Sequence, residues 1–132
     1  MKMIKNIWCV TLYVSDLKKA IEFYEKILGL TKKYEYSSYA GFECGGVEIG
    51  LIPKDRVETG STTPTVEFIV DNVDRFYEML KKKNVDVIEP PHEEQWGGRQ
   101  ASFKDPDGNV LEVVQISWAK YFGVATKGAK RQ

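Results

Sequence analysis

The sequence predicts an α+β fold built from two β-α-β-β-β modules, and two internal repeats carry this prediction. Residues 10–17 align without a gap with residues 66–73, an offset of 56, and an amphipathic stretch follows each copy. Residues 46–52 align with residues 108–114 at an offset of 62. A duplication of this size indicates a paired supersecondary unit, because a solenoid needs at least three short repeats. We therefore expect one cupped mixed sheet with the helices on its outer face.

The first module extends over about residues 5–52. Residues 7–14 alternate in polarity and are rich in β-branched and aromatic side chains, which is typical of a strand. Asp16 or Ser15 suits a helix N-cap, and an apolar stripe continues to Leu28, just before a terminating Gly29. Three short strands should follow, at about residues 32–37, 38–43 and 46–52. Residues 53–63 have the composition of a linker.

The second module, about residues 64–116, repeats this order. Residues 65–70 read as a strand, and Asn72 should cap the second helix. A short strand at 85–88, a long loop at 89–97 and strands at 98–104 and 109–116 complete the module. The turn between the last two strands is Asp-Pro-Asp-Gly-Asn. The tail, residues 117–132, is compatible with docking on the domain, with an oligomer contact or with disorder.

Composition narrows the possible partners. The chain has 132 residues, enough for one domain with a core, and 19 basic residues balance 19 acidic ones. Because the chain carries no net charge, nucleic acid or an anionic membrane is not expected to be its main partner. The sequence has no apolar run long enough to span a bilayer and no signal-peptide pattern at its start, so we expect a cytoplasmic protein.

Strand parity separates the two faces of the sheet, since successive side chains point to opposite sides. Val10, Leu12 and Val14 form a uniformly apolar face that should lie under a helix. Cys9, Thr11 and Tyr13 form the opposite face, where polar and apolar residues mix as in a ligand-binding concavity. In the later strands Thr65, Glu67 and Glu112 have this second parity, and Glu48 shares it.

The sequence resembles the vicinal oxygen chelate superfamily, the glyoxalase, bleomycin resistance protein and dioxygenase family. The resemblance is carried by Val-Thr-Leu-Tyr-Val-Ser-Asp-Leu at residues 10–17, by Ala-Ile-Glu-Phe-Tyr-Glu-Lys-Ile-Leu-Gly-Leu at 20–30 and by Phe-Lys-Asp-Pro-Asp-Gly-Asn-Val-Leu-Glu at 103–112. It covers about residues 5–116. It implies the glyoxalase/bleomycin resistance fold and a homodimer.

The resemblance also implies where a metal would be bound. Many enzymes of this superfamily place ligands at four concave positions, which here are Cys9, Gly50, Thr65 and Glu112. Only Glu112 matches the usual ligand type, since Gly50 has no side chain and Thr65 is a poor ligand for transition metals. We therefore expect no divalent metal cofactor. Glu112 is either a general base or an inherited carboxylate that only makes hydrogen bonds, and the sequence does not decide between these.

The other candidate ligand-binding residues follow from the concave parity and from the long loop. Trp96 is the best candidate, because a loop tryptophan offers a large flat apolar surface. Arg99 suits either a bidentate contact with an anionic ligand or an internal ion pair. An aromatic wall could include Tyr13, Tyr39, Phe42 and Phe103. The full predicted set is Cys9, Thr11, Tyr13, Glu48, Thr65, Glu67, Trp96, Arg99, Phe103 and Glu112.

These observations favour a protein that binds a small aromatic or apolar molecule in its cleft without metal, as bleomycin resistance proteins do. The alternative is a lyase or isomerase of the glyoxalase type that uses Glu112 as a ligand or base. A third possibility is a dimeric interaction or sensor module without turnover. The sequence is thus compatible with a binding protein and with an enzyme of the glyoxalase type.

Overall fold

The computed structural model describes residues 3–56 and 63–127. In the first module, β1 (Ile4–Val14) is followed by α1 (Leu17–Glu22), the π-helical turn η1 (Phe23–Ile27), β2 (Thr31–Tyr36), β3 (Tyr39–Cys44), β4 (Val47–Pro53) and the short 3-10 helix η2 (Lys54–Arg56). In the second module, β5 (Thr65–Val70) is followed by α2 (Val73–Lys82), β6 (Val87–Glu93), β7 (Gly98–Lys104) and β8 (Val110–Ile116). The helix α3 (Trp118–Lys127) completes the described chain. The predicted β-α-β-β-β order is confirmed in both modules.

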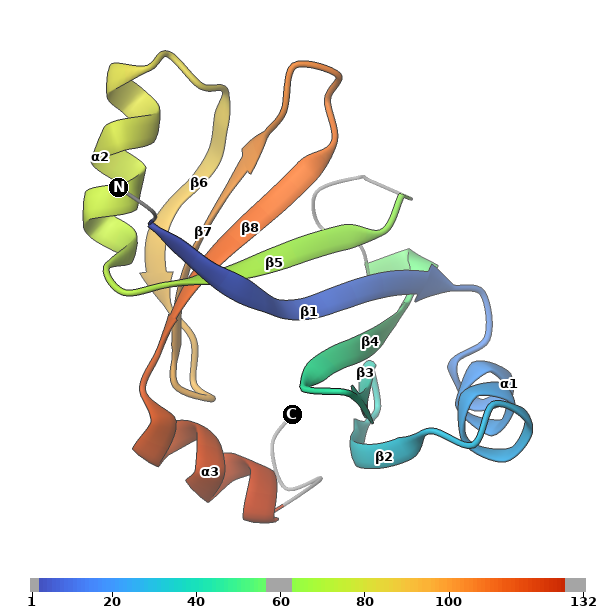
Figure 1. Cartoon of the computed structure of the whole chain (residues 1–132). Coiled ribbons are helices and arrows are strands. Elements are labelled where there is room, and N and C mark those ends of the chain that lie inside the picture. Colours follow the sequence, from blue (N-terminus) through green and yellow to red (C-terminus); the bar gives the residue numbers. More distant parts are fainter. Residues whose placement is uncertain (1–2, 57–62, 128–132) are drawn as a thin grey trace.

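All eight strands belong to one curved mixed sheet in the order β2-β3-β4-β1-β5-β8-β7-β6 (Figure 1). The modules join where β1 pairs antiparallel with β5 at the centre of the sheet. Within each module the first strand pairs in parallel with the last, β1 with β4 and β5 with β8. A single chain therefore supplies both halves of the cup.

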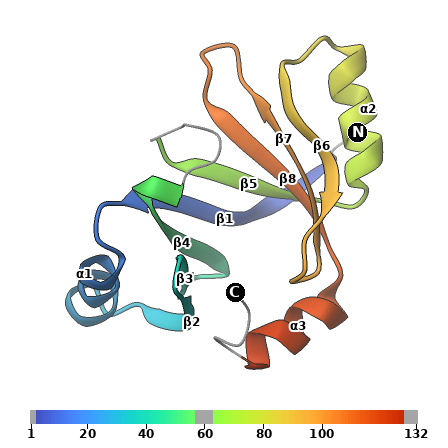
Figure 2. The same ribbon diagram turned by 180° about the vertical axis from the view of Figure 1, so that it is seen from behind.

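The two helices that follow the first strand of each module cover the outer face of the sheet at opposite ends (Figures 1 and 2). Asp16 and Asn72 cap them, each through a side-chain oxygen that accepts a hydrogen bond from a backbone N–H three residues later. Under α1 the buried core contains Ile21, Ala40, Phe42 and Leu51. Under α2 it contains Val70, Val73, Phe76, Leu80, Ala101, Phe103 and Val113.

The end of the first helix differs from the predicted apolar stripe. The backbone N–H of Leu28 bonds the carbonyl of Phe23, five residues earlier, so this turn is wider than an α-helical one. The wider turn rotates the following side chains away from the sheet. Ile27 is 71% exposed and Leu28 is 52% exposed, so the prediction that both are buried is wrong.

The second half of the chain has more regular structure than predicted. Most of the expected loop 89–97 is strand, because β6 continues to Glu93. Pro90 and Pro91 are tolerated there because β6 is an edge strand, where an N–H is not needed by a second neighbour. The tail forms α3, except for residues 128–132, which lie outside the described residues. In the expected linker, residues 57–62 are likewise not described.

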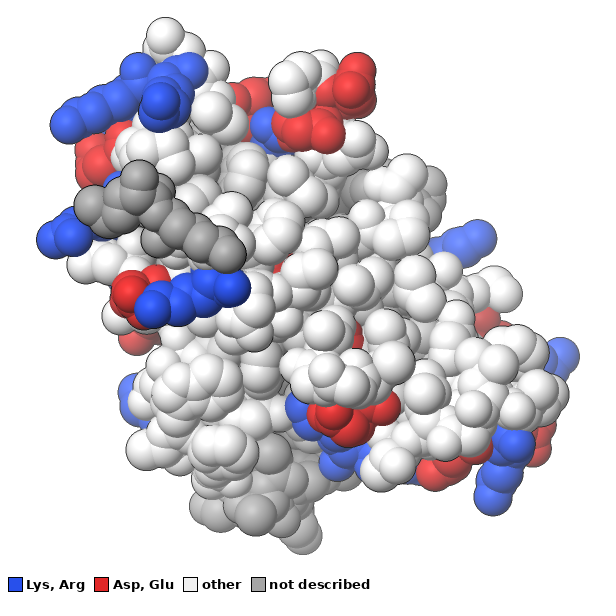
Figure 3. Space-filling model, in the orientation of Figure 1, with Lys and Arg blue, Asp and Glu red and all other residues white. Residues whose placement is uncertain are grey.

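The described helices are all too short and too polar to cross a bilayer. Figure 3 shows one face of the molecule, on which basic and acidic side chains of both signs lie mainly towards the edges. This distribution agrees with the balanced composition and gives this face no continuous patch of one charge.

Candidate functional site

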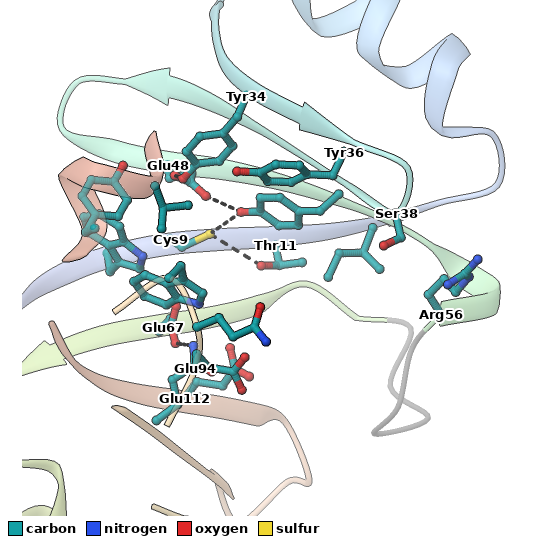
Figure 4. A pocket seen from close by; sticks show the side chains of 18 of the residues that line it. Cys9, Thr11, Tyr34, Tyr36, Ser38, Glu48, Arg56, Glu67, Glu94 and Glu112 are labelled. Carbon is teal, nitrogen blue, oxygen red and sulfur yellow. Dashed lines mark hydrogen bonds between the residues drawn. The ribbon is translucent and has the colours of Figure 1, made fainter. Parts of the chain in front are cut away.

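The concave face of the sheet encloses a cavity of about 730 Å³, open on one side. Side chains from β1, β2, β3, β4, β5, β7 and β8 line it, together with the segment 93–96 and α3. Figure 4 shows Tyr34, Tyr36 and Glu48 on the first-module side, and Glu67, Glu94 and Glu112 gathered on the second-module side. Arg56 lies apart from these carboxylates at the far end. The lining therefore combines aromatic rings with five glutamates and one arginine.

Trp8 lines the cavity although simple alternation places it on the opposite face from Cys9. The reason is a β-bulge in β1: Ile7 pairs with Phe68 and Cys9 pairs with Glu67, so two steps on β1 match one step on β5. A bulge of this kind redirects a side chain. The Trp8 ring stacks on Trp96 with centroids 6.2 Å apart and an interplanar angle of 7°.

The C-terminal helix borders the same end of the cup. In Figures 1 and 2 α3 leaves the end of β8 and lies below the sheet, towards β2. Tyr121 on α3 packs edge-on against Trp8, with ring centroids 5.0 Å apart. Lys33 Nζ lies 5.3 Å from the Trp8 ring centroid and 5.2 Å from that of Tyr121, within cation–π distance. The prediction left the role of the tail open, and the structure shows that it docks here.

Glu48 is a buried carboxylate whose partners all come from the first module. It accepts hydrogen bonds from the hydroxyls of Tyr34 and Tyr39 and from Lys33 Nζ at 3.0 Å. Burial lowers the pKa of Lys33, but the hydrogen bonds that its ammonium makes to Tyr121 and Glu48, together with the negative charge of Glu48, outweigh burial, so the net shift is upward and the lysine stays charged. Glu48 is thus held as one half of a buried ion pair.

Two glycines provide the space for the tyrosine rings. A Cβ added to Gly50 would lie 2.9 Å from both Cε1 and Cζ of Tyr39, and closer still to the hydroxyl. A Cβ added to Gly41 would meet the Tyr34 ring and would lie 3.0 Å from a Glu48 oxygen. Each ring therefore rests directly on a bare glycine backbone, which no other residue permits without displacement.

Cys9 lies at the floor of the cup, where its Sγ is 3.6 Å from Thr11 Oγ1 and 3.7 Å from Tyr39 Oη. Burial and then the carboxylates Glu48 and Glu67 raise the pKa of the thiol to about 12. The thiol is therefore protonated at neutral pH and is a poor nucleophile, because the thiolate is the reactive form.

Glu67 and Glu112 lie side by side on the parallel strands β5 and β8. Glu67 accepts a hydrogen bond of 2.5 Å from Gln100 Nε2. Burial, followed by the charge of Glu112, raises the pKa of Glu67 well above its usual value. Burial likewise raises the pKa of Glu112 to about 7, with Glu89 adding to the shift and His92 opposing it. The two carboxylates are thus poised to hold a proton or to accept a positive charge.

Comparisons with known proteins identify the family. The model of the Glyoxalase/Bleomycin resistance protein/Dioxygenase superfamily matches residues 7–113. The chain belongs to this superfamily. It is 31% identical over 122 residues to the uncharacterized protein YraH of Bacillus subtilis. The aligned region covers 81% of this chain and 95% of YraH. It is 30% identical over 116 residues to the metallothiol transferase FosB of Staphylococcus haemolyticus, with 84% of each chain covered.

Solved structures of the superfamily fold share the architecture. The methylmalonyl-CoA epimerase of Mycobacterium tuberculosis superposes with a TM-score of 0.75, covering 89% of this chain and 91% of the epimerase at 18% identity. At this identity the likeness shows the fold alone. The Mn(II)-bound glyoxalase of Novosphingobium aromaticivorans superposes with a TM-score of 0.68 over 87% of this chain, which covers 40% of that longer protein at 21% identity.

The metal positions expected from the superfamily resemblance do not form a metal site among the described residues. Those residues contain no cluster of three or more His, Cys, Asp or Glu side chains that could hold an ion. The Tyr39 ring occupies the space beside Gly50, and the Thr65 hydroxyl bonds that of Tyr13 at 2.7 Å. Cys9 is held as a thiol. Glu112 is the remaining donor, so the residues present do not fit a transition metal with open coordination sites.

Some of the predicted site residues line the cavity and others do not. The cavity is lined by Cys9, Thr11, Glu48, Glu67, Trp96 and Glu112. Tyr13 and Thr65 are not among the lining residues, because their hydroxyls are turned towards each other.

For three aromatic or basic candidates the predicted position in the cavity is wrong. Phe103 and Phe42 face the opposite side of the sheet and are buried in the two cores beneath the helices. Arg99 also lies on that outer side of β7, where its guanidinium makes a bidentate ion pair with Asp74 at 2.9 and 2.8 Å. Of the two roles considered for Arg99, the internal ion pair is therefore the one observed.

Sequence reasoning missed several lining residues, namely Trp8, Tyr34, Gln100 and Tyr121. Gln100 could have been found from strand parity. Residues 100 and 103 of one strand face opposite sides, so with Phe103 in the core beneath the helix, Gln100 faces the cavity. The bulge that turns Trp8 inwards and the docking of α3 had no such local signal.

Proposed function

We propose that the protein binds a small molecule with a flat apolar part in the cup and does so without a metal ion, in the manner of bleomycin resistance proteins. The observation that carries this proposal is the position of Tyr39. Its ring lies over Gly50, at the position where the superfamily resemblance implies a metal ligand. A hydrogen-bonded aromatic side chain therefore lies where a metal ligand would be expected.

The dimensions and lining of the cavity support a small-molecule ligand. Pockets for such ligands typically measure about 300–1,000 Å³ and combine aromatic walls with a few fixed polar groups, and this cavity of about 730 Å³ lies within that range. Trp8 and Trp96 present stacked rings, and Tyr34 stacks on Tyr36 with an interplanar angle of 20°. Flat ligands gain most from such walls.

A thermal-shift screen of aromatic compounds, run with and without EDTA, tests this proposal. A compound present at 100 times its dissociation constant should stabilise the fold by about 2.7 kcal/mol, and EDTA should leave that gain unchanged. Loss of the gain in EDTA would contradict metal-independent binding. A complete lack of response across a broad aromatic library would instead favour an interaction or sensor module.

The raised pKa of Glu112 supports a second candidate, a lyase or isomerase of the glyoxalase type. A carboxylate with a pKa of about 7 is well matched to act as a general base near neutral pH. Turnover of an α-oxo or thioester substrate would have to be lost in Glu112→Gln. The activity named for FosB, a metallothiol transferase, fits this chain less well, because Cys9, Gly50, Thr65 and Glu112 are a poor donor set for a transition metal.

The proposal includes a homodimer in the cytoplasm. Light scattering after size-exclusion chromatography tests the oligomeric state: a mass near twice 15.1 kDa supports the dimer, and a mass near 15.1 kDa contradicts it.

A further inference from the structure

The buried carboxylate Glu67 and the half-buried carboxylate Glu112 have no positive partner within the described chain. Glu48 pairs with Lys33 and Glu93 with Arg99, at 3.0 and 3.7 Å. None of the ion pairs among the described residues includes Glu67 or Glu112. Adjacent carboxylates that are largely removed from water repel one another and are costly unless a counter-charge or a proton is present.

The groups around this pair do not supply that charge. Gln100 donates a neutral amide hydrogen bond to Glu67. Glu48 and Glu94 add negative potential at Glu67, and Glu89 and Glu94 add it at Glu112, where His92 opposes them only in part. His92 is itself occupied, since its Nε2 lies 3.2 Å from a Glu94 oxygen. Arg56, the arginine in the cavity lining, lies at the other end of the cavity (Figure 4).

A second observation points to a missing polar partner at the same place. Ser102 is 2% exposed, and its Oγ has no hydrogen-bond partner among the described residues. Ser102 pairs with Glu112 across β7 and β8, and it shares the parity of Gln100, whose side chain reaches Glu67. Buried hydroxyls are nearly always satisfied, so the unpartnered Ser102 Oγ, on the strand next to Glu112, indicates that a hydrogen-bonding group is missing on this face of the sheet.

We propose that the ligand carries a protonated nitrogen, which docks between Glu67 and Glu112 while its flat part lies against the aromatic wall that includes Trp96. An ammonium or amidinium group offers several N–H donors, enough for both carboxylates. Trp96 and Glu112 line the same cavity, so one small molecule reaches both. This inference rests on the proposed function and names the chemical class of the ligand.

Three probes of nearly equal shape test the charge requirement: 1-naphthylmethylamine, 1-naphthalenemethanol and 1-naphthaleneacetate, measured by isothermal titration calorimetry at pH 7.5. The cationic amine should bind about ten- to hundredfold more tightly than the neutral alcohol, since charge-assisted hydrogen bonds are stronger than neutral ones. The anionic acetate should bind more weakly than either. Equal binding of amine and alcohol, or preference for the acetate, would overturn the inference.

Two variants locate the contact. Glu112→Gln and Glu67→Gln keep the shape of the side chain and remove its charge, so each should reduce amine affinity about tenfold or more and leave alcohol affinity nearly unchanged. Glu78→Gln is the matched control, because Glu78 is exposed on α2 and its ion pair among the described residues is with Lys81. An equal effect in the control, or unchanged amine affinity in both cavity variants, would contradict the proposed contact. Thermal unfolding of each variant verifies that it is folded.

The experiment separates the two proposals. If the alcohol binds as tightly as the amine, the cation inference fails while binding of an aromatic molecule stands. If none of the three probes binds at millimolar concentration, both proposals fail for this class of compound. If the amine binds preferentially and that preference disappears in Glu112→Gln, both are supported.

Discussion

The seating of Tyr39 on Gly50 predicts that adding a single methyl group at position 50 is harmful. The Cβ of Gly50→Ala would lie 2.9 Å from two ring carbons of Tyr39, whereas carbon atoms normally approach to about 3.5–4.0 Å. The ring is not free to swing away, because its hydroxyl donates to Glu48 and contacts Cys9 Sγ at 3.7 Å. Tyr39 or the strand below it must therefore shift.

Two opposing contributions set the magnitude. Overpacking of this kind costs about 1–3 kcal/mol. Replacing glycine by alanine at a compatible backbone position returns about 0.4–1 kcal/mol by restricting the unfolded chain, and Gly50 has no positive φ that would oppose this gain. The expected net loss in the free energy of unfolding is about 0.5–2 kcal/mol.

Urea denaturation followed by circular dichroism measures this difference. Gly123→Ala on α3 is the matched control, since nothing lies within 4 Å of its added Cβ, and it should stabilise the protein by up to about 1 kcal/mol. In a Tyr39→Ala background the cost of Gly50→Ala should disappear, which a double-mutant cycle detects. A neutral or stabilising Gly50→Ala in the wild-type background would refute the reasoning.

Three further predictions concern buried charges and thiols. Iodoacetamide at pH 8, followed by mass spectrometry, should label the exposed Cys44 and leave Cys9 unmodified, because burial raises the Cys9 pKa to about 12; rapid labelling of both would contradict this. Since folding raises the pKa of Glu112 from 4.5 to about 7, the folded state binds a proton that the unfolded chain releases, so the free energy of unfolding should fall by up to about 3 kcal/mol as pH rises through that interval. Urea titrations at pH 5 and 8 should show a smaller fall in Glu112→Gln, and an identical fall would be inconsistent with the shift. Lys33→Met should destabilise by about 2–3 kcal/mol, because it leaves the buried carboxylate of Glu48 without its counter-charge. The neighbouring Lys32 pairs with Glu35, whose side chain is 39% exposed, so Lys32→Met should cost at most about 1 kcal/mol; equal losses would contradict the buried ion pair.

The repeat and the strand parity were sufficient to predict most of the architecture. In a regular strand a residue's side of the sheet follows from its position, so the sequence alone predicts that Cys9, Glu48, Glu67 and Glu112 share one face. The structure brings these four side chains to the same cavity. The helix caps Asp16 and Asn72 were also predictable, because capping depends on local chemistry.

The remaining features depend on interactions that local patterns do not contain. A bulge in β1 is fixed by its pairing with β5, so the inward turn of Trp8 follows from tertiary structure. The π turn after α1 similarly reverses the expected burial of Ile27. The docking of α3 depends on contacts between Tyr121 and residues more than a hundred positions earlier, such as Trp8.

We propose above that the cup of this superfamily member binds its ligand without a metal. Elemental analysis of the protein, purified without chelators or affinity metals, is the sharpest test of metal-independent binding. We predict far less than one equivalent of nickel, zinc, iron, cobalt or manganese, and no increase in thermal stability when these ions are added. One equivalent of any of them, retained after gel filtration and lost in Glu112→Gln, would contradict the account.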